Sequence, residues 1–264
     1  FAKSDYIVSI GNHMKKLIIS NYNINEGKIT VIQNGALNDL KSSTTIKSAN
    51  DHNQKINGNF IVQYSGNLGR AHEIETIIDA LKYVDENNFN LKFSFIGGGF
   101  NYDKLKQIAK KSKIKCASFF PYVDRKDLYR SLSKSDIQLV ISKKELSGVI
   151  FPSKFYGIIA VGKPLLYICD GEDDITEYIN KYKIGLIVPN GHSKELVDKL
   201  LFLKNSPDLL NEFSNNALSL FKKFDSESRP FVLYKILFDH LNVKEYLWKP
   251  TSEIFLDISK GNTI

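Results

Sequence analysis

The sequence predicts an α/β fold in which a parallel sheet carries helices on both faces. From Phe60 onward, short apolar runs of strand length alternate with segments whose apolar residues recur at helical spacing. Repeated strand and helix units require parallel strands, because each helix returns the chain to the same edge of the sheet. Glycine-rich or polar turns follow the strands at the edge where such sheets hold ligands. We therefore predict a Rossmann-like domain with a site beyond the carboxyl ends of its strands.

A shorter unit precedes this repeat. Its pattern predicts a strand at 6–10, a helix at 12–20 and a strand at 28–32. Two strands and one helix cannot enclose a core, so we expect the remnant of a preceding α/β domain. The chain begins at Phe1 with no signal-peptide pattern, and we expect it to be a piece of a longer protein.

Four parts are predicted along the chain. Residues 1–40 end a truncated amino-terminal domain, and residues 41–58, rich in Ser, Thr, Asn and Lys, form a linker. Residues 59–228 form the Rossmann-like domain, and residues 229–264 form a carboxy-terminal helix and tail. The strands of the Rossmann-like domain are predicted at 60–64, 91–96, 118–120, 137–141, 165–168 and 186–188. Apolar spacing predicts helices around 74–81, 105–108, 128–132, 193–203 and 207–223.

The stretch from Gly148 to Ile168 contains a loop, a helix, a stop and a strand whose signals agree. Pro152 suits a first helical position, Gly162 suits the left-handed residue that ends a helix, and 165–168 is an apolar run of buried-strand type. A helix that begins near Pro152 leaves three amides unpaired, those of Ser153, Lys154 and Phe155. Amides at a helix start, beside a hydroxyl and an ammonium, suit a phosphate.

Each motif alone also has a plainer interpretation. The Pro-Ser-Lys sequence is compatible with an ordinary helix start and a solvated lysine. The turn SGNLGR (65–70) follows a strand and opens a helix, where it either approaches an anion or simply reverses the chain. The three glycines at 97–99 form either a flexible turn or room for a flat ring. We interpret Glu145 as a solvated carboxylate, and Asp173 and Asp174 as a helix start.

Composition narrows the classes of function. The net charge of +7 and the isoelectric point near 9.1 come mainly from lysines spread along the predicted helices. Arginine usually dominates base and phosphate recognition and is scarce here, so we expect no nucleic-acid partner. The charge suits an anionic substrate or an anionic membrane leaflet. The two cysteines have no metal or redox spacing and the five histidines are scattered, so we expect no metal site and a cytoplasmic protein.

Five segments carry a family resemblance, in this order: VIQNGAL, YSGNLGRAHEIETIIDAL, FSFIGGGF, FFPYVDRKDLYRSLSKSDIQLV and GVIFPSKFYGIIAVGKPLL. Together they resemble the carboxy-terminal, donor-binding half of retaining glycosyltransferases of the GT-B type, the family called glycosyl transferases group one. The likeness runs from about residue 6 to residue 234. The SGNLGR and PSK forms are most similar to the branch that builds bacterial surface polysaccharides by transferring N-acetylated amino sugars onto lipid-linked acceptors.

The resemblance implies a donor site. In this family the carboxy-terminal half binds a nucleoside diphosphate sugar, which is a substrate and not a cofactor. The base, expected to be uracil, would lie near Gly98, Tyr122 and Val123. Catalytic roles at the diphosphate are implied for Lys154 and Arg70. Further contacts to the sugar and phosphates are implied for Gly66, Asn67, Ser147, Gly148, Pro152 and Ser153.

The sequence also departs from the family pattern. Many members have an arginine at the position of Asn67, a lysine at that of His72 and a ribose-binding glutamate at that of Gly157. Positive charge at the diphosphate would therefore come from Arg70 and Lys154, and the ribose contact stays unassigned. Glu145 does not align with the other family glutamate.

These inferences predict the function of the whole protein. We expect transfer of a sugar with retention, from a UDP-linked donor to a polysaccharide or lipid-linked acceptor, with a peripheral contact to the inner membrane. The acceptor site would lie in the preceding domain, so the chain alone should be inactive. A nucleotide-sugar epimerase and a non-catalytic binding or partner subunit remain as alternatives. A dinucleotide oxidoreductase is disfavoured, because no GxGxxG follows the first strand of the repeat.

Overall fold

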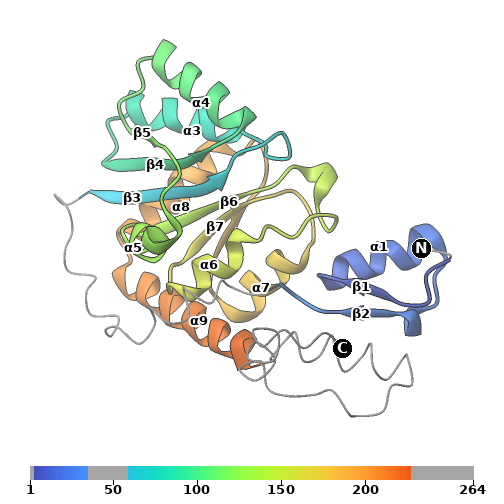
Figure 1. The fold of residues 1–264 in the computed structure, drawn as a ribbon. Coiled ribbons are helices and arrows are strands. Elements are labelled where there is room, and N and C mark those ends of the chain that lie inside the picture. The colour runs from blue at the N-terminus through green and yellow to red at the C-terminus, as the bar shows by residue number, and fades with distance from the viewer. Residues whose placement is uncertain (1–2, 35–58, 227–264) are drawn as a thin grey trace, which may run out of the picture. The chain divides into compact units, whose positions relative to one another are not determined.

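The computed structural model describes residues 3–34 and 59–226. The predicted linker and the predicted carboxy-terminal helix and tail lie outside these ranges. The first range contains β1 (Ile7–Ser9), α1 (Asn12–Tyr22) and β2 (Ile29–Val31) (Figure 1). The strands of the second range are β3 (Phe60–Asn67), β4 (Leu91–Gly98), β5 (Ala117–Phe120), β6 (Ile137–Ile141), β7 (Leu165–Ile168) and β8 (Gly185–Val188). Its helices are α3 (Glu75–Glu86), α4 (Phe100–Lys111), α5 (Leu128–Ser133), α6 (Lys154–Ala160), α7 (Asp174–Tyr182), α8 (Ser193–Lys204) and α9 (Pro207–Ser226).

The six strands of the second range form one parallel sheet in the order β5-β4-β3-β6-β7-β8. Within this range, the first strand, β3, lies at the centre of the sheet, and β4 and β5 follow outward on one side. The chain then crosses back and places β6 on the other side of β3. Strand order therefore reverses between β3 and β6. Loops diverge at such a point and leave a crevice at the carboxyl ends of the strands, where α/β sheets bind ligands.

Two strands run further than the sequence pattern predicts. The pairing of β3 with β4 continues from Tyr64 and Phe95 to Asn67 and Gly98. The residues added at these ends are mainly polar or glycine, so they carry no apolar signal and are held in the sheet by backbone hydrogen bonds. The predicted turn SGNLGR therefore starts inside a strand. It also does not open a helix directly, because α3 begins only at Glu75.

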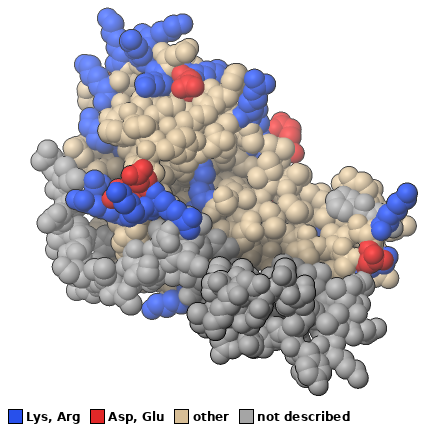
Figure 2. All heavy atoms as spheres, in the orientation of Figure 1, with Lys and Arg blue, Asp and Glu red and all other residues tan. Residues whose placement is uncertain are grey.

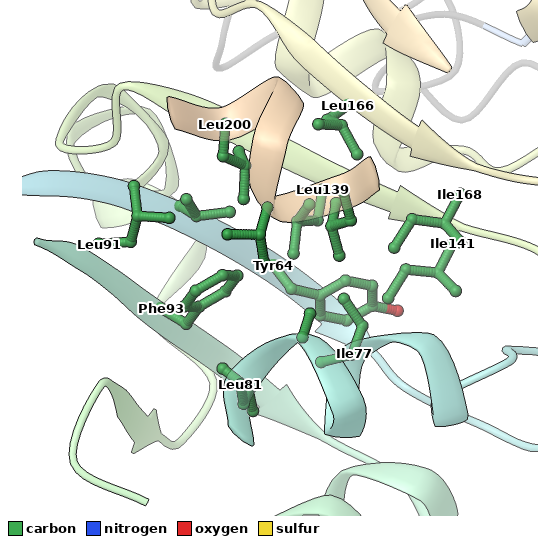
Figure 3. Packing of buried hydrophobic residues seen from close by; sticks show 14 of the residues in the cluster. Tyr64, Ile77, Leu81, Leu91, Phe93, Leu139, Ile141, Leu166, Ile168 and Leu200 are labelled. Carbon is green, nitrogen blue, oxygen red and sulfur yellow. The ribbon is translucent and has the colours of Figure 1, made fainter. Parts of the chain in front are cut away.

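A hydrophobic core lies on each face of the sheet. On one face, side chains of β3, β4, β6 and β7 meet those of α3 and α8, including Tyr64, Ile77 and Leu200 (Figure 3). On the other face, α5, α6, α7 and α9 cover Val140, Tyr167 and their neighbours. Each fully buried large apolar side chain contributes about 1.5–3 kcal/mol relative to exposure. Helices on both faces confirm the predicted α/β class.

The amino-terminal segment forms a small unit with its own apolar cluster. Strands β1 and β2 pair in parallel, and Ile7, Ile18 and Ile29 pack together between them and α1. The carboxylate of Asp174, in the first turn of α7, accepts hydrogen bonds from the backbone amides of Asn12 at 2.7 Å and His13 at 3.1 Å. Asp174 therefore caps α1, whose own N-cap position, a glycine, has no side chain to do so. Within the described ranges, no helix has both the length and the apolar character needed to span a membrane.

Candidate functional site

A pocket of about 650 Å³ opens at the carboxyl ends of β3, β4, β5 and β6. It coincides with the crevice expected where strand order reverses. Its walls come from β3 and the turn after it, from the segment between β5 and α5, and from the loop that leads into α6. All three segments occur in the motifs on which the family resemblance rests. The fold brings them to one place.

Lys154 is the basic residue at the centre of this site. It lines the pocket, its Nζ atom is buried, and that atom has no hydrogen-bond partner among the described residues. Nζ lies 3.4 Å from the centroid of the Tyr64 ring, over its face. Burial lowers the pKa of Lys154 to about 7. A buried ammonium without a hydrogen-bond acceptor is costly, so the arrangement favours an anionic ligand that would supply one.

The charges around the pocket have one sign. Its lining contains the cations Lys154 and Arg125 and no aspartate or glutamate. Among the described residues, no group of acidic, histidine or cysteine side chains could hold a metal ion. On the face shown in Figure 2, basic side chains are scattered over α4 and α5 and do not gather in one stripe. The pocket therefore suits an anionic ligand.

Seven of the residues assigned to the site from the sequence line this pocket. They are Gly66, Asn67, Tyr122, Val123, Pro152, Ser153 and Lys154. Tyr122 is largely exposed, at 62%, and lies at the mouth. Gly98 is not among the residues that line the pocket. The ring of Tyr122 lies beside it, since a Cβ at Gly98 would stand 3.2 Å from Cε2 of that ring.

The glycines at 97–99 do not form a flexible turn. Gly97 and Gly98 belong to β4, and Gly97 has φ +135°. A Cβ at Gly97 would stand 2.1 Å from the carbonyl oxygen of Gly66, so only glycine allows the two strands to approach there. The ring that lies beside this backbone in the structure is that of Tyr122.

Arg70 lies outside the pocket. Its side chain is exposed, and its guanidinium stacks over the ring of Phe100 at 4.3 Å from the centroid. Arg70 follows β3 and Phe100 follows β4, so this contact could not be read from sequence spacing. The structure thus does not bring Arg70 to Lys154 as the resemblance implied.

Ser147 and Gly148 also lie away from the pocket. The hydroxyl of Ser147 donates to the carbonyl of Glu172 at 3.3 Å, in the turn before α7. Gly148 is buried against α1, where an added Cβ would stand 3.2 Å from Cβ of His13. Both residues therefore contact other elements in the structure.

The start of α6 differs from the prediction. The helix begins at Lys154 rather than near Pro152, and it is only seven residues long. The amide of Phe155 donates to the carbonyl of Pro152 at 3.0 Å, so it is not one of the unpaired amides. A tight turn at 152–155 replaces the expected first helical turn. A helix this short has a small dipole, so the ammonium of Lys154 is the main positive charge at this end of the pocket.

Three structural interpretations made from the sequence hold. Asp173 is the N-cap of α7 and forms a capping box with Thr176. Gly162 follows α6 with φ +63°, as a helix-ending residue should. Glu145 is exposed and does not line the pocket.

Several pocket residues were not identified as such from the sequence. His72 appears in the sequence only as a departure from a family pattern, and Tyr64, whose ring lies against Lys154 without lining the pocket, only as a strand residue. The inner wall is apolar and contains Leu128, Leu132 and Ile158 beside Gly157. Their apolar spacing signals helix packing, and nothing in the sequence separates side chains that face a pocket from those that face the core.

Comparisons with known proteins agree with this fold. A family model described as glycosyl transferases group 1 matches residues 45–219. The probable glycosyltransferase WbjE of Pseudomonas aeruginosa is 30% identical over 132 residues, which cover 50% of this chain and 32% of that protein. Alignments with the curated relatives cover between 25% and 60% of their lengths, so the chain corresponds to part of each.

Solved structures show the same architecture. A complex of Staphylococcus aureus TarM with fondaparinux, alpha-GlcNAc-glycerol and UDP superposes with a TM-score of 0.68 at 18% identity, covering 89% of this chain and 44% of that one. Anabaena HepE in complex with UDP-glucose has a TM-score of 0.68 at 16% identity, covering 89% of this chain and 64% of that one. At these identities the likeness concerns the fold. The chain belongs to the glycosyl transferases group 1 family, as the five sequence segments predict, and its sheet has the GT-B architecture.

Proposed function

We propose that the whole protein transfers a sugar from a UDP-linked donor to a saccharide or lipid-linked acceptor, and that this chain is mainly its donor-binding half. Residues 59–228 would be the donor domain, and the segment before residue 41 the end of the acceptor domain. The observation that carries the proposal is the buried ammonium of Lys154, which has no hydrogen-bond partner among the described residues and lies in a pocket lined by no carboxylate.

Lys154 would act on the leaving group. When the bond between the anomeric carbon and the β-phosphate oxygen breaks, negative charge develops on the diphosphate. A positioned ammonium in a site with little water stabilises that charge, and removing one such donor typically lowers turnover about 100-fold or more. Ser153, beside Lys154, would add a hydroxyl donor. Arg70 would join them only by leaving the ring of Phe100, so Lys154 is the main candidate.

The base and the ribose would occupy the apolar part of the pocket. Val123, Leu128 and Leu132 provide a surface on which the flat face of a base can pack. Gly157 leaves that part open, so the ribose would be held by groups other than a carboxylate at this position. A uracil base is proposed because TarM and HepE were solved with UDP or UDP-glucose.

The acceptor and the stereochemistry are inferred from the family. We propose retention at the anomeric carbon, an N-acetylated sugar and a surface-polysaccharide acceptor, from likeness to the polysaccharide-building branch. A cytoplasmic location with a peripheral membrane contact fits a lipid-linked acceptor and the net positive charge. No cofactor is required by this reaction.

Product analysis tests this proposal. The protein that contains this chain and any preceding domain is incubated with UDP-N-acetylglucosamine or UDP-glucose, with and without a saccharide or lipid-linked acceptor. The proposal predicts a new glycoside with the donor's anomeric configuration, formed only when acceptor is present, and no transfer by residues 1–264 alone. Free sugar released without acceptor would indicate the epimerase, and no product with normal folding would indicate a binding subunit.

A further inference from the structure

Two unlike groups lie against the ring of Tyr64 at the edge of the pocket. The ammonium of Lys154 lies over the face of the ring, and the imidazole of His72 meets the ring edge to face, with centroids 5.9 Å apart. Tyr64 is fully buried, and its hydroxyl donates to the carbonyl of Asn67 at 2.8 Å. The tyrosine is therefore a fixed platform that holds a cation and an imidazole close to each other.

The contacts of His72 determine which ring nitrogen carries the proton. Nδ1 lies 3.1 Å from the carbonyl oxygen of Gly69. A carbonyl can only accept, so Nδ1 carries the hydrogen and Nε2 of the neutral ring is left as an acceptor. No described residue hydrogen-bonds to Nε2, and His72 lines the pocket. Burial, together with the positive charges of Lys154 and Lys143, lowers the pKa of His72 to about 4, which keeps the ring neutral near pH 7.

The ammonium of Lys154 and Nε2 of His72 suit different parts of one ligand. A bound diphosphate presents acceptor oxygens, which suit the ammonium of Lys154 but not an unprotonated ring nitrogen. A sugar joined to that diphosphate presents hydroxyl donors within a few bonds of the phosphate. A ligand with both features satisfies both residues.

We propose that His72 is a specificity-determining residue whose Nε2 accepts a hydrogen bond from a hydroxyl group of the transferred sugar. The proposal rests on the donor-binding function proposed above and assigns part of the sugar recognition to this histidine. It also gives a physical reason for a histidine at a position next to a buried lysine: a second cation there would repel Lys154, whereas a neutral acceptor does not.

Calorimetric titration with and without the sugar tests the assignment. Wild-type chain, His72→Leu and His72→Gln are titrated near neutral pH with UDP, UDP-glucose and UDP-N-acetylglucosamine. His72→Leu removes both ring nitrogens and should weaken the better of the two sugar nucleotides about fivefold to tenfold, the loss typical of one hydrogen bond, while UDP changes by less than about twofold. His72→Gln, whose amide oxygen can replace Nε2, should recover most of the loss.

The control variant is Lys154→Met, which should weaken all three compounds. An equal loss for UDP and the sugar nucleotides in His72→Leu, or no loss for either, overturns the role of His72 while the donor site stands. If His72→Gln behaves like His72→Leu despite normal UDP binding, the acceptor role is likewise wrong. If the wild-type chain binds none of the compounds, the donor-binding function fails as well.

Discussion

Lys154 has two properties that rarely occur together in a stable fold, a buried ammonium and no hydrogen-bond acceptor among the described residues. The sequence predicts a phosphate contact for Lys154, because Pro-Ser-Lys at a loop-to-helix junction is a local signal. The neighbours of Lys154 could not be predicted, since Tyr64 and His72 come from β3 and the turn after it, far from Lys154 in the sequence. The place of Arg70 could not be predicted from the sequence, because its contact with Phe100 depends on how the turns after β3 and β4 lie side by side.

The pKa of Lys154 predicts how donor affinity changes with pH. With a pKa of about 7 in the unliganded protein, Lys154 loses its proton as the pH rises above 7. A bound diphosphate favours the protonated form, so affinity should fall by up to about tenfold for each pH unit above 7. Calorimetry with UDP-glucose between about pH 6 and pH 9 measures this, since its diphosphate, esterified at both ends, keeps a constant charge there. Affinity that stays constant or rises over this range would contradict the assignment.

The same lysine should weaken the fold. Its folded-state pKa, about 7, is below the unfolded value near 10.4, so the unfolded chain binds more protons between these values and wild-type stability rises with pH there. Lys154→Met removes the buried charge and should raise the free energy of unfolding by about 1–3 kcal/mol at pH 7 and below. Urea denaturation measures it. The gain should shrink towards pH 10, and a loss of stability at pH 7 would show that Lys154 is already well stabilised.

At the scale of the elements, strand and helix identities follow the apolar periodicity closely. The predicted boundaries are wrong where polar residues or glycine form the end of a strand or the start of a helix. The ends of β3 and β4 are held by backbone pairing alone, and α6 starts late because the chain first makes a tight turn at Pro152. The stop after α6 is correctly predicted, because a left-handed glycine followed by a proline is a local signal that the sequence itself contains.

Gly162 offers a test of how α6 and α9 fit together. A Cβ at this position would stand 2.6 Å from Cγ of Leu218 in α9, whereas a Cβ at Gly191, which also has positive φ, would meet nothing within 4 Å. Gly191→Ala should therefore cost only the strain of a left-handed residue, about 1–2 kcal/mol. Gly162→Ala should cost about 1–3 kcal/mol more because of overpacking.

Urea denaturation of the two variants compares these costs under one set of conditions. Equal losses of stability in the two variants would mean that Leu218 can move aside at little cost. The packing of α6 on α9 would then be looser than the structure indicates.

At the scale of the whole molecule, the reversal of strand order between β3 and β6 places the site. Alternating strand and helix patterns predict the sheet and the edge that carries ligands, but not the strand order. The contact between α1 and α7 could not be predicted either, because it joins Asn12 and His13 to Asp174 across more than half of the chain. The chain also covers only part of its relatives, so it accounts for one side of the proposed reaction.

Asp174 should hold the amino-terminal segment in place. Asp174→Ala removes the cap of α1 and should increase local opening of that helix about fivefold, the effect of losing about 1 kcal/mol. Hydrogen exchange of the amides in 12–22 measures this, with exchange in β3 and β6 as an internal reference. Glu172→Ala, at an exposed neighbouring carboxylate, is the matched control. Unchanged exchange in α1 would show that the apolar cluster around Ile18 is sufficient to hold it.

The most direct test of the donor site is calorimetric titration of this chain with UDP, GDP and ADP. Two variants provide the comparison: Lys154→Met in the pocket and Lys163→Met, which removes a second buried lysine whose pKa is lowered to about 8 but which does not line the pocket. The wild-type chain and Lys163→Met should bind UDP in preference to the other two compounds, and Lys154→Met should bind UDP about 10-fold to 100-fold more weakly. Equal UDP affinity in wild type and Lys154→Met, or no binding of any of the three compounds to the wild-type chain, would contradict the donor-site assignment.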